Sequence, residues 1–381
     1  MGRRARSCRR LSPKLAGCLT GRARVGLRKG CAPWYLWTLV IEIRGRGVRG
    51  DELVVWYKAV DFPVLGGKVT RHLTFSIDSL AHALFVTGRA PGDTARHGLT
   101  SSFEWLHRVS LIPAYLRRHP NGWVMRSDLA RELDQSEKVA LSYTLGQGMT
   151  GIFSTHVLSV RFLMHIDRYG GSHGVLVDPR SKRRADFFGQ RHSGGWVVAE
   201  AKGRSNPIDY RLKRSMQSQK RTVRSIGGVA PEIAYGCAAY FEETDAGVER
   251  MCLFAVDPEE DEPEAVDLRV DDPDSFVLAY YEPFLAALEA GEPLPDAVSD
   301  YFTASFGPYG LQVSVLRPIV ERVREARRGR LRGLRDDVVE LLGPFTLWET
   351  PEGHFADGTR VATKWASALN QQDWGGIEER W

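Results

Sequence analysis

Two carboxylates and one amine recur at a spacing that could bind a metal ion. Asp186 is followed after 13 intervening residues by Glu200, and Lys202 lies two residues beyond Glu200. Two carboxylates held close together repel each other unless a proton or a cation lies between them. Carboxylate, water and phosphate oxygens are the ligands that Mg²⁺ prefers. These side chains therefore predict a site for Mg²⁺ or Mn²⁺, in which Lys202 could stabilise negative charge that develops during a reaction.

A β-hairpin over residues 184–202 would position these side chains. The connection His192-Ser193-Gly194 separates two segments of strand composition. If the turn centres on Ser193, Asp186 lies directly opposite Glu200, where cross-strand Cβ atoms are about 4.5–5.5 Å apart. Lys202 shares the face of Glu200 because side chains alternate along a strand. The opposite face would belong to the core and would carry Ala185, Phe187, Val197, Ala199 and Ala201.

The elements around the hairpin predict an α/β fold. We expect a helix from Ser136 to about Leu158, a strand over 160–167, the two hairpin strands, a helix over 207–226, and strands over 232–241 and 249–256. Ser205 or Asn206 would cap the second helix. The order α-β-β-β-α-β-β predicts a mixed β-sheet with flanking helices.

The motif and this order resemble the PD-(D/E)XK nuclease superfamily, which includes restriction endonucleases, over residues 136–256. Arg184-Ala185 stands where the family has a proline before the aspartate. The resemblance implies a restriction-endonuclease-like core, in which Asp186, Glu200 and the backbone carbonyl of Ala201 bind the metal ion. It also implies that Lys202 works on the attacking water, that the activity is metal-dependent hydrolysis of phosphodiester bonds, and that the chain defends against foreign DNA.

The local charge favours nucleic acid as the partner. Residues 180–224 hold 13 Arg or Lys against three acids, two of which are the proposed metal ligands. A basic surface around a metal site suits a phosphate backbone, and we expect DNA. The predicted contacts are Arg183, Arg184, Arg204, Lys213, Gln217 and Lys220. For Gln217 and Lys220 of the expected 207–226 helix, an ordinary solvated basic face is an equally good interpretation.

The chain divides by composition into five parts. These are a basic tail (1–32), an N-terminal α+β region (33–135), the nuclease-like core (136–256), an acidic linker (257–275) and a mainly helical C-terminal region (276–381). Residues 1–30 hold ten basic side chains and no acidic one, whereas residues 257–274 hold ten acidic side chains and one arginine. Such charge runs are typical of solvated segments.

Several classes of protein are disfavoured. No run of 18 apolar residues is present, so we expect no membrane span. The five cysteines are odd in number and form no CxxC pair, which argues against a zinc site and a disulfide scaffold and favours the cytoplasm.

Two other interpretations of the residues stay open. The chain could be a nucleic-acid-binding protein that keeps the fold without catalysis, or a scaffold with a coincidental ion cluster in a hairpin. The residues also leave open whether the substrate is DNA or RNA, whether cleavage is internal or terminal, and whether a second copy or another protein takes part.

Overall fold

The structure is a computed structural model that describes residues 50–88, 97, 100–169, 185–218, 221–258, 260–270, 272–294, 300–344, 347–350 and 354–371. These described residues belong to one compact unit. The basic tail and the apolar residues 34–43 lie outside the described residues. Among the described residues, no helix is both long and apolar enough to cross a membrane.

A large mixed β-sheet forms the centre of this unit, and the prediction of a mixed sheet flanked by helices is confirmed. Its strand order is β2-β1-β10-β9-β7-β6-β5. β1 is parallel to β10 and β7 is parallel to β9, whereas the other neighbours are antiparallel. The strands are β1 (Glu52–Phe62), β2 (Gly67–Ser76), β5 (Val160–His165), β6 (Phe187–Arg191), β7 (Trp196–Arg204), β9 (Ile233–Glu243) and β10 (Glu249–Val256).

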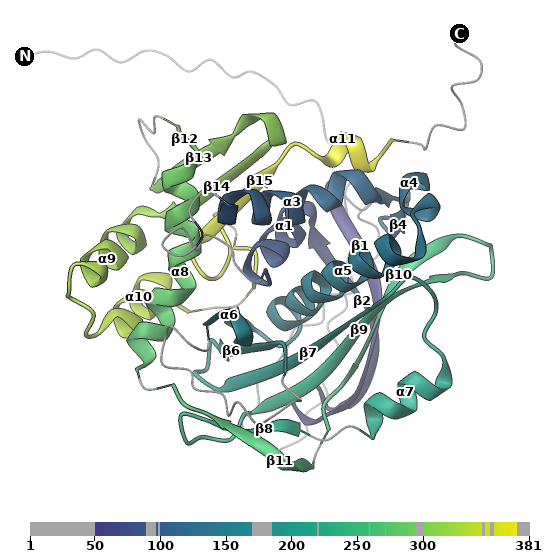
Figure 1. Ribbon diagram of the computed structural model, residues 1–381, viewed down its shortest axis with the longest axis horizontal. Helices are drawn as coiled ribbons and strands as arrows, with labels where there is room; N and C mark the ends of the chain where they lie inside the picture. The colour runs from purple at the N-terminus through teal and green to yellow at the C-terminus, as the bar shows by residue number, and fades with distance from the viewer. Residues whose placement is uncertain are drawn as a thin grey trace, which may run out of the picture. The chain divides into compact units, whose positions relative to one another are not determined.

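Helix α5 (Gln135–His156) covers one face of this sheet and crosses β7 and β9 (Figure 1). Asp134 begins the helix, because its carboxylate accepts hydrogen bonds from the amides of Ser136 and Glu137. The side chain of Glu137 accepts a hydrogen bond from the amide of Asp134, which completes a capping box. The face of α5 toward the sheet is apolar and buried, with Leu145, Met149, Ile152 and Phe153.

Glycine allows α5 to approach β7 closely beside the candidate site. A β-carbon added at Gly203 would lie 1.7 Å from the backbone oxygen of Ser142, and one at Gly146 would lie 2.7 Å from the backbone oxygen of Lys202. Both obstacles are main-chain atoms, which cannot move aside alone. β7, which carries Glu200 and Lys202, is therefore held against α5 by direct backbone contact.

We expect Gly203→Ala to lower the free energy of unfolding by about 3 kcal/mol, because helix and strand must separate to admit the methyl group. Gly307→Ala is the control, since a β-carbon there meets no atom within 4 Å. Urea denaturation measures both variants. A Gly203→Ala protein as stable as wild type would contradict the close packing of α5 on β7.

The crossover from β7 to its parallel neighbour β9 contains α7 (Tyr210–Gln217) and β8 (Arg221–Ile226). In Figure 1, α7 lies on the side of the sheet opposite to α5. Ile208 and Met216 anchor this segment in a second apolar cluster, where they join Ala238, Phe254 and Val256 of the sheet.

The prediction of one helix over 207–226 is wrong in its second half. The helix begins after Asp209, whose side chain accepts from the amide of Leu212, and not at Ser205 or Asn206. Residues 221–226 form β8, which pairs in parallel with β11 (Asp261–Leu268). Val223 and Ile226 are buried there in the main core, whereas Met216 is buried in the second cluster. The apolar residues of this segment thus pack in two separate clusters, which one face of a single helix could not contact.

The acidic segment also differs from expectation. Residues 257–275 contain β11 and the start of α8 (Pro273–Ala290), and Val266 and Leu268 of β11 are buried. Exposed Asp267 lies between these two buried residues, so the high charge did not prevent a strand. Ion pairs join the acids to β8, as in the contact of Arg224 with Asp267 at 3.7 Å.

The described residues before α5 form both helices and strands, and their strands β1 and β2 belong to the same sheet as β6 and β7. Smaller elements follow them along the chain. These are η1 (Pro63–Leu65), α1 (Ile77–Val86), α3 (Thr100–Tyr115), β3 (Leu116–Arg118), β4 (Val124–Arg126), α4 (Asp128–Glu132) and, after β5, α6 (Ile166–Tyr169).

The C-terminal region is less helical than predicted, because four of its strands form a sheet in the order β12-β13-β14-β15. Alternating buried residues such as Val313 and Val315 build this sheet against α8 and α9. The elements are β12 (Glu292–Pro293), β13 (Tyr301–Phe306), η2 (Gly307–Tyr309), β14 (Leu311–Leu316), α9 (Arg317–Arg327), α10 (Leu334–Leu342), β15 (Thr359–Thr363) and α11 (Ala366–Leu369).

Candidate functional site

The hairpin of β6 and β7 has the predicted register. Phe187 lies opposite Ala199, and Phe188 lies opposite Val198. Gly194 closes the turn with a positive φ of 89°, a conformation that glycine adopts without strain. Continued by one residue, this register sets Asp186 across from Glu200, as the sequence predicted.

Asp186 immediately precedes β6, and its carboxylate binds the main chain of β7. Oδ2 accepts a hydrogen bond of 2.8 Å from the amide of Ala201. The backbone oxygen of Asp186 accepts another, also 2.8 Å, from the amide of Ile166. The side chain therefore supplies the acceptor for an amide of β7 where the β6–β7 ladder ends. This bond holds Asp186 beside the Glu200-Ala201-Lys202 segment.

The surroundings of Asp186 disfavour a bare negative charge. Burial raises the pKa of Asp186 to about 6, although the amide of Ala201 lowers it. The charge of Glu200 raises the pKa further, that of Lys202 lowers it, and that of Asp167 raises it. A half-buried carboxylate beside other carboxylates gains stability from a cation, and this is the electrostatic character of a metal site.

Glu200 and Lys202 share the face of β7 that points away from α5. The β-carbon direction of Gly203 leads into α5, so the alternating positions 200 and 202 point to the other side. Nζ of Lys202 donates to Oε1 of Glu200, and both side chains are partly exposed. The ammonium therefore lies beside one of the two proposed metal-binding carboxylates.

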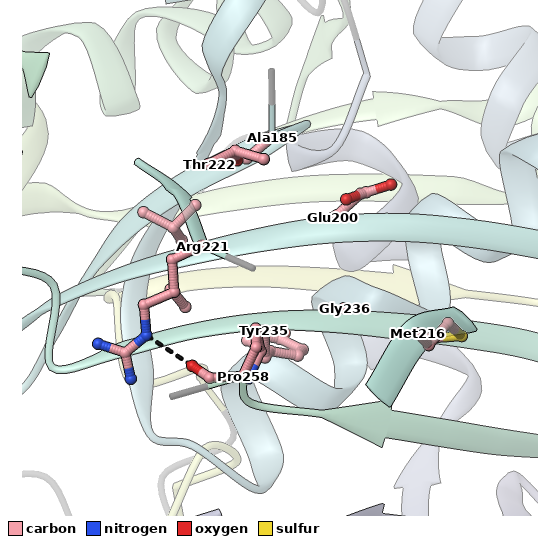
Figure 2. A pocket seen from close by; sticks show the side chains of 10 residues that line it. Ala185, Glu200, Met216, Arg221, Thr222, Tyr235, Gly236 and Pro258 are labelled. Atoms are coloured by element: carbon pink, nitrogen blue, oxygen red, sulfur yellow. Dashed lines mark hydrogen bonds between the residues drawn. The ribbon is translucent and has the colours of Figure 1, made fainter. Parts of the chain in front are cut away.

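A small cavity of about 20 Å³ lies on the same face (Figure 2). Glu200 and Met216 line it, and the guanidinium of Arg221 turns toward Pro258, to whose oxygen Nε donates at 2.7 Å. Arg221 is also 3.4 Å from Asp257, so its charge is already neutralised. A cavity of this size admits roughly one water-sized particle, and not a nucleotide.

The protein ligands available for a metal ion are few. No group of three or more His, Cys, Asp or Glu side chains close enough to hold a metal ion is found in the described part of the chain. Asp186, Glu200 and the carbonyl of Ala201 remain as a donor set of oxygen atoms only. Mg²⁺ is commonly held by one or two carboxylates, with water and substrate phosphate completing its octahedron. The residues present fit such an ion and do not form a closed protein cage.

The predicted nucleic-acid contacts fall into two groups. Arg204 is exposed at the end of β7, and Gln217 is exposed at the end of α7. Lys213 lies over the ring of Tyr240 with Nζ 5.9 Å from its centroid, and Tyr240 pairs with Arg204 across β7 and β9. Arg204 and Lys213 are thus brought together. The other three, Arg183, Arg184 and Lys220, lie outside the described residues.

A second cavity, of about 330 Å³, lies among β2, the end of α5 and residues 347–349. Its Glu349 accepts hydrogen bonds from the side chains of Ser76 and Ser79 and from the amide of Ser76, at the start of α1. Ser76 is the cap of α1, because its hydroxyl accepts from the amide of Ser79, and Glu349 holds this cap in place. None of the three motif side chains lines this cavity.

Comparisons with protein-family models, curated proteins and solved structures return no match for this chain.

Proposed function

We propose that this protein is a metal-dependent nuclease of the PD-(D/E)XK type, which hydrolyses phosphodiester bonds in nucleic acid, with DNA as the favoured substrate. The observation that carries the proposal is the register of β6 and β7. It sets Asp186 across from Glu200, and strand alternation adds Lys202 on the same face. A structural hairpin has no need of two repelling carboxylates at this point.

The order of elements supports the same proposal. α5, β5, β6 and β7 are followed by a helix and then by β9, which is parallel to β7. The PD-(D/E)XK resemblance implies the order α-β-β-β-α-β. β8 is an addition between α7 and β9 that does not alter the pairing of β7 with β9.

The residues divide the chemistry among themselves. Asp186, Glu200 and the carbonyl of Ala201 would hold Mg²⁺, which supplies a Lewis acid for a phosphate oxygen. Lys202 holds the attacking water and stabilises the charge on the phosphate as that water bonds to phosphorus. The bond from phosphorus to the leaving oxygen breaks, the water loses a proton to solvent, and the leaving oxygen gains one. The amide of Ala201 keeps Asp186 in place throughout.

The test is a cleavage assay on supercoiled DNA, linear duplex DNA, single-stranded DNA and single-stranded RNA, with Mg²⁺, Mn²⁺ or EDTA. We expect metal-dependent cleavage that Glu200→Gln abolishes and that Glu243→Gln, which changes an exposed glutamate of β9, leaves intact. If wild type cleaves no nucleic acid with either metal, the nuclease proposal is overturned. Binding without cleavage would then identify a non-catalytic nucleic-acid-binding protein.

A further inference from the structure

The segment that leaves the candidate site stays basic beyond the ion pair of Lys202 with Glu200. From Lys202 to Ser218 the chain has five Lys or Arg and one acid, Asp209, whose carboxylate caps α7. Within the described part of the chain, Arg204, Arg211 and Arg214 form no ion pair. The next arginines do, since Arg221 pairs with Asp257 and Arg224 pairs with Asp267.

Helix α7 presents an aromatic ring among these charges. Tyr210 is 73% exposed, the largest value among the exposed large hydrophobic side chains of the described residues. A single exposed aromatic side chain is ordinary by itself. Here it has a basic setting, because Tyr210 and Arg214 are one helical turn apart, where Cβ atoms are about 5–6 Å from each other. Arg211 is the next residue and is also exposed.

The helix is a fixed platform and not a loose loop. Met216 is 2% exposed and packs on the sheet with Ile208, while the amide of Leu212 bonds to the cap Asp209. The inner face of α7 therefore packs against the sheet. The outer face, with Tyr210, Arg211 and Arg214, is exposed to solvent.

We infer that this outer face of α7 binds single-stranded nucleic acid, with one unpaired base stacked on Tyr210 and the adjoining phosphates held by Arg211 and Arg214. The inference rests on the proposed function and narrows its substrate to nucleic acid that is unpaired next to the site. Base–aromatic stacking tolerates any sequence and requires an unpaired base, because a duplex keeps both base faces covered.

The dimensions agree with this ligand. Eight helical residues extend about 12 Å, which is the reach of roughly two nucleotides along an extended strand. Lys213 and Arg204 continue the positive charge from α7 to the end of β7, two residues from Lys202. A single strand stacked on Tyr210 would thus have basic side chains along its path toward Glu200.

The test measures binding by fluorescence anisotropy in EDTA, so that no cleavage occurs, with labelled single-stranded DNA, single-stranded RNA and a duplex of the same sequence. We expect Tyr210→Leu to weaken binding of single strands by about tenfold and to leave duplex binding unchanged, whereas Tyr210→Phe keeps wild-type affinity. Phe103→Leu is the matched control, since Phe103 is 63% exposed and lies on α3.

The arginines are tested by salt dependence. Arg211→Ala combined with Arg214→Ala should reduce the slope of log affinity against log salt by roughly 1 to 1.5 for single strands. Arg328→Ala with Arg332→Ala, at exposed positions after α9, should leave the slope unchanged. Equal weakening of single strands and duplex by Tyr210→Leu, or no weakening of either, overturns the inference.

Failure of the inference and failure of the proposed function give different results. Metal-dependent cleavage that is indifferent to Tyr210→Leu on every substrate leaves the nuclease standing and removes the single-strand surface. Tyr210-dependent binding without cleavage at any metal concentration removes the nuclease proposal and leaves the single-strand surface standing.

Discussion

Lys202→Ala should still bind Mg²⁺ or Mn²⁺ but cleave nucleic acid about 10²- to 10³-fold more slowly than wild type. The ammonium is not a metal ligand, and its effect in the proposed mechanism falls on the water and the developing charge, where loss of one stabilising donor costs about this factor. In the structure, Nζ of Lys202 donates to Glu200, which lies on the same face of β7. It is thus near the metal site without competing for a place in it.

The variant should also stay folded. The pair of Lys202 and Glu200 is partly exposed, and such pairs contribute about 0–1 kcal/mol. Rates from single-turnover cleavage, read beside a metal titration by thermal shift, separate catalysis from binding. Lys68→Ala, at the exposed start of β2, is the control. Cleavage by Lys202→Ala at the wild-type rate would refute the assigned role of the lysine. It would not test the metal-binding role proposed for Asp186 and Glu200.

The sequence predicted the part of the site that depends on strand periodicity. Turn residues around Ser193 and the alternation of small apolar with charged positions fix both the register and the face, because a slip by one residue would bury Glu200 against α5. The sheet requires that register whatever the function. The sequence also predicted a helix between the strands that became β7 and β9, but it did not predict that these two strands pair in parallel.

The parts that sequence could not predict depend on contacts between distant segments. Val223 and Ile226 continue the apolar spacing of α7, and only the partner strand β11, some 40 residues later, draws residues 221–226 into a strand. The contact between Gly203 and Ser142 is equally non-local. The hydrogen bond from the amide of Ala201 to the carboxylate of Asp186 could not be predicted either, because it depends on where the β6–β7 pairing ends.

The exposed face of α7 was not predicted. Tyr210, Arg211 and Arg214 lie within about 100° of one another on a helical wheel, whichever residue caps the helix. The basic face was assigned instead to Lys213, Gln217 and Lys220. Lys213 lies over the ring of Tyr240 on β9, a contact between distant segments that the sequence does not show.

Asp186→Asn should raise the stability of the metal-free protein at pH 8 and abolish both metal binding and cleavage. The pKa of Asp186 is about 6 in the fold, above the ordinary value of 3.8, so the folded state binds this proton more tightly than the unfolded chain does. Stability from the protonated form is complete below about pH 4 and is lost as pH rises through 6. Asparagine avoids that loss, and its side-chain oxygen can still accept from the amide of Ala201.

The gain should be about 1–2 kcal/mol at pH 8 and near zero at pH 4, after discounting the shift for the partial exposure of the carboxylate. Urea denaturation at both pH values measures it, with Asp245→Asn in the exposed β9–β10 turn as the control. Mn²⁺ should raise the melting temperature of wild type more at pH 7 than at pH 5, because metal and proton compete for Asp186. The same rise in Asp186→Asn would place the bound metal elsewhere and remove Asp186 from the site.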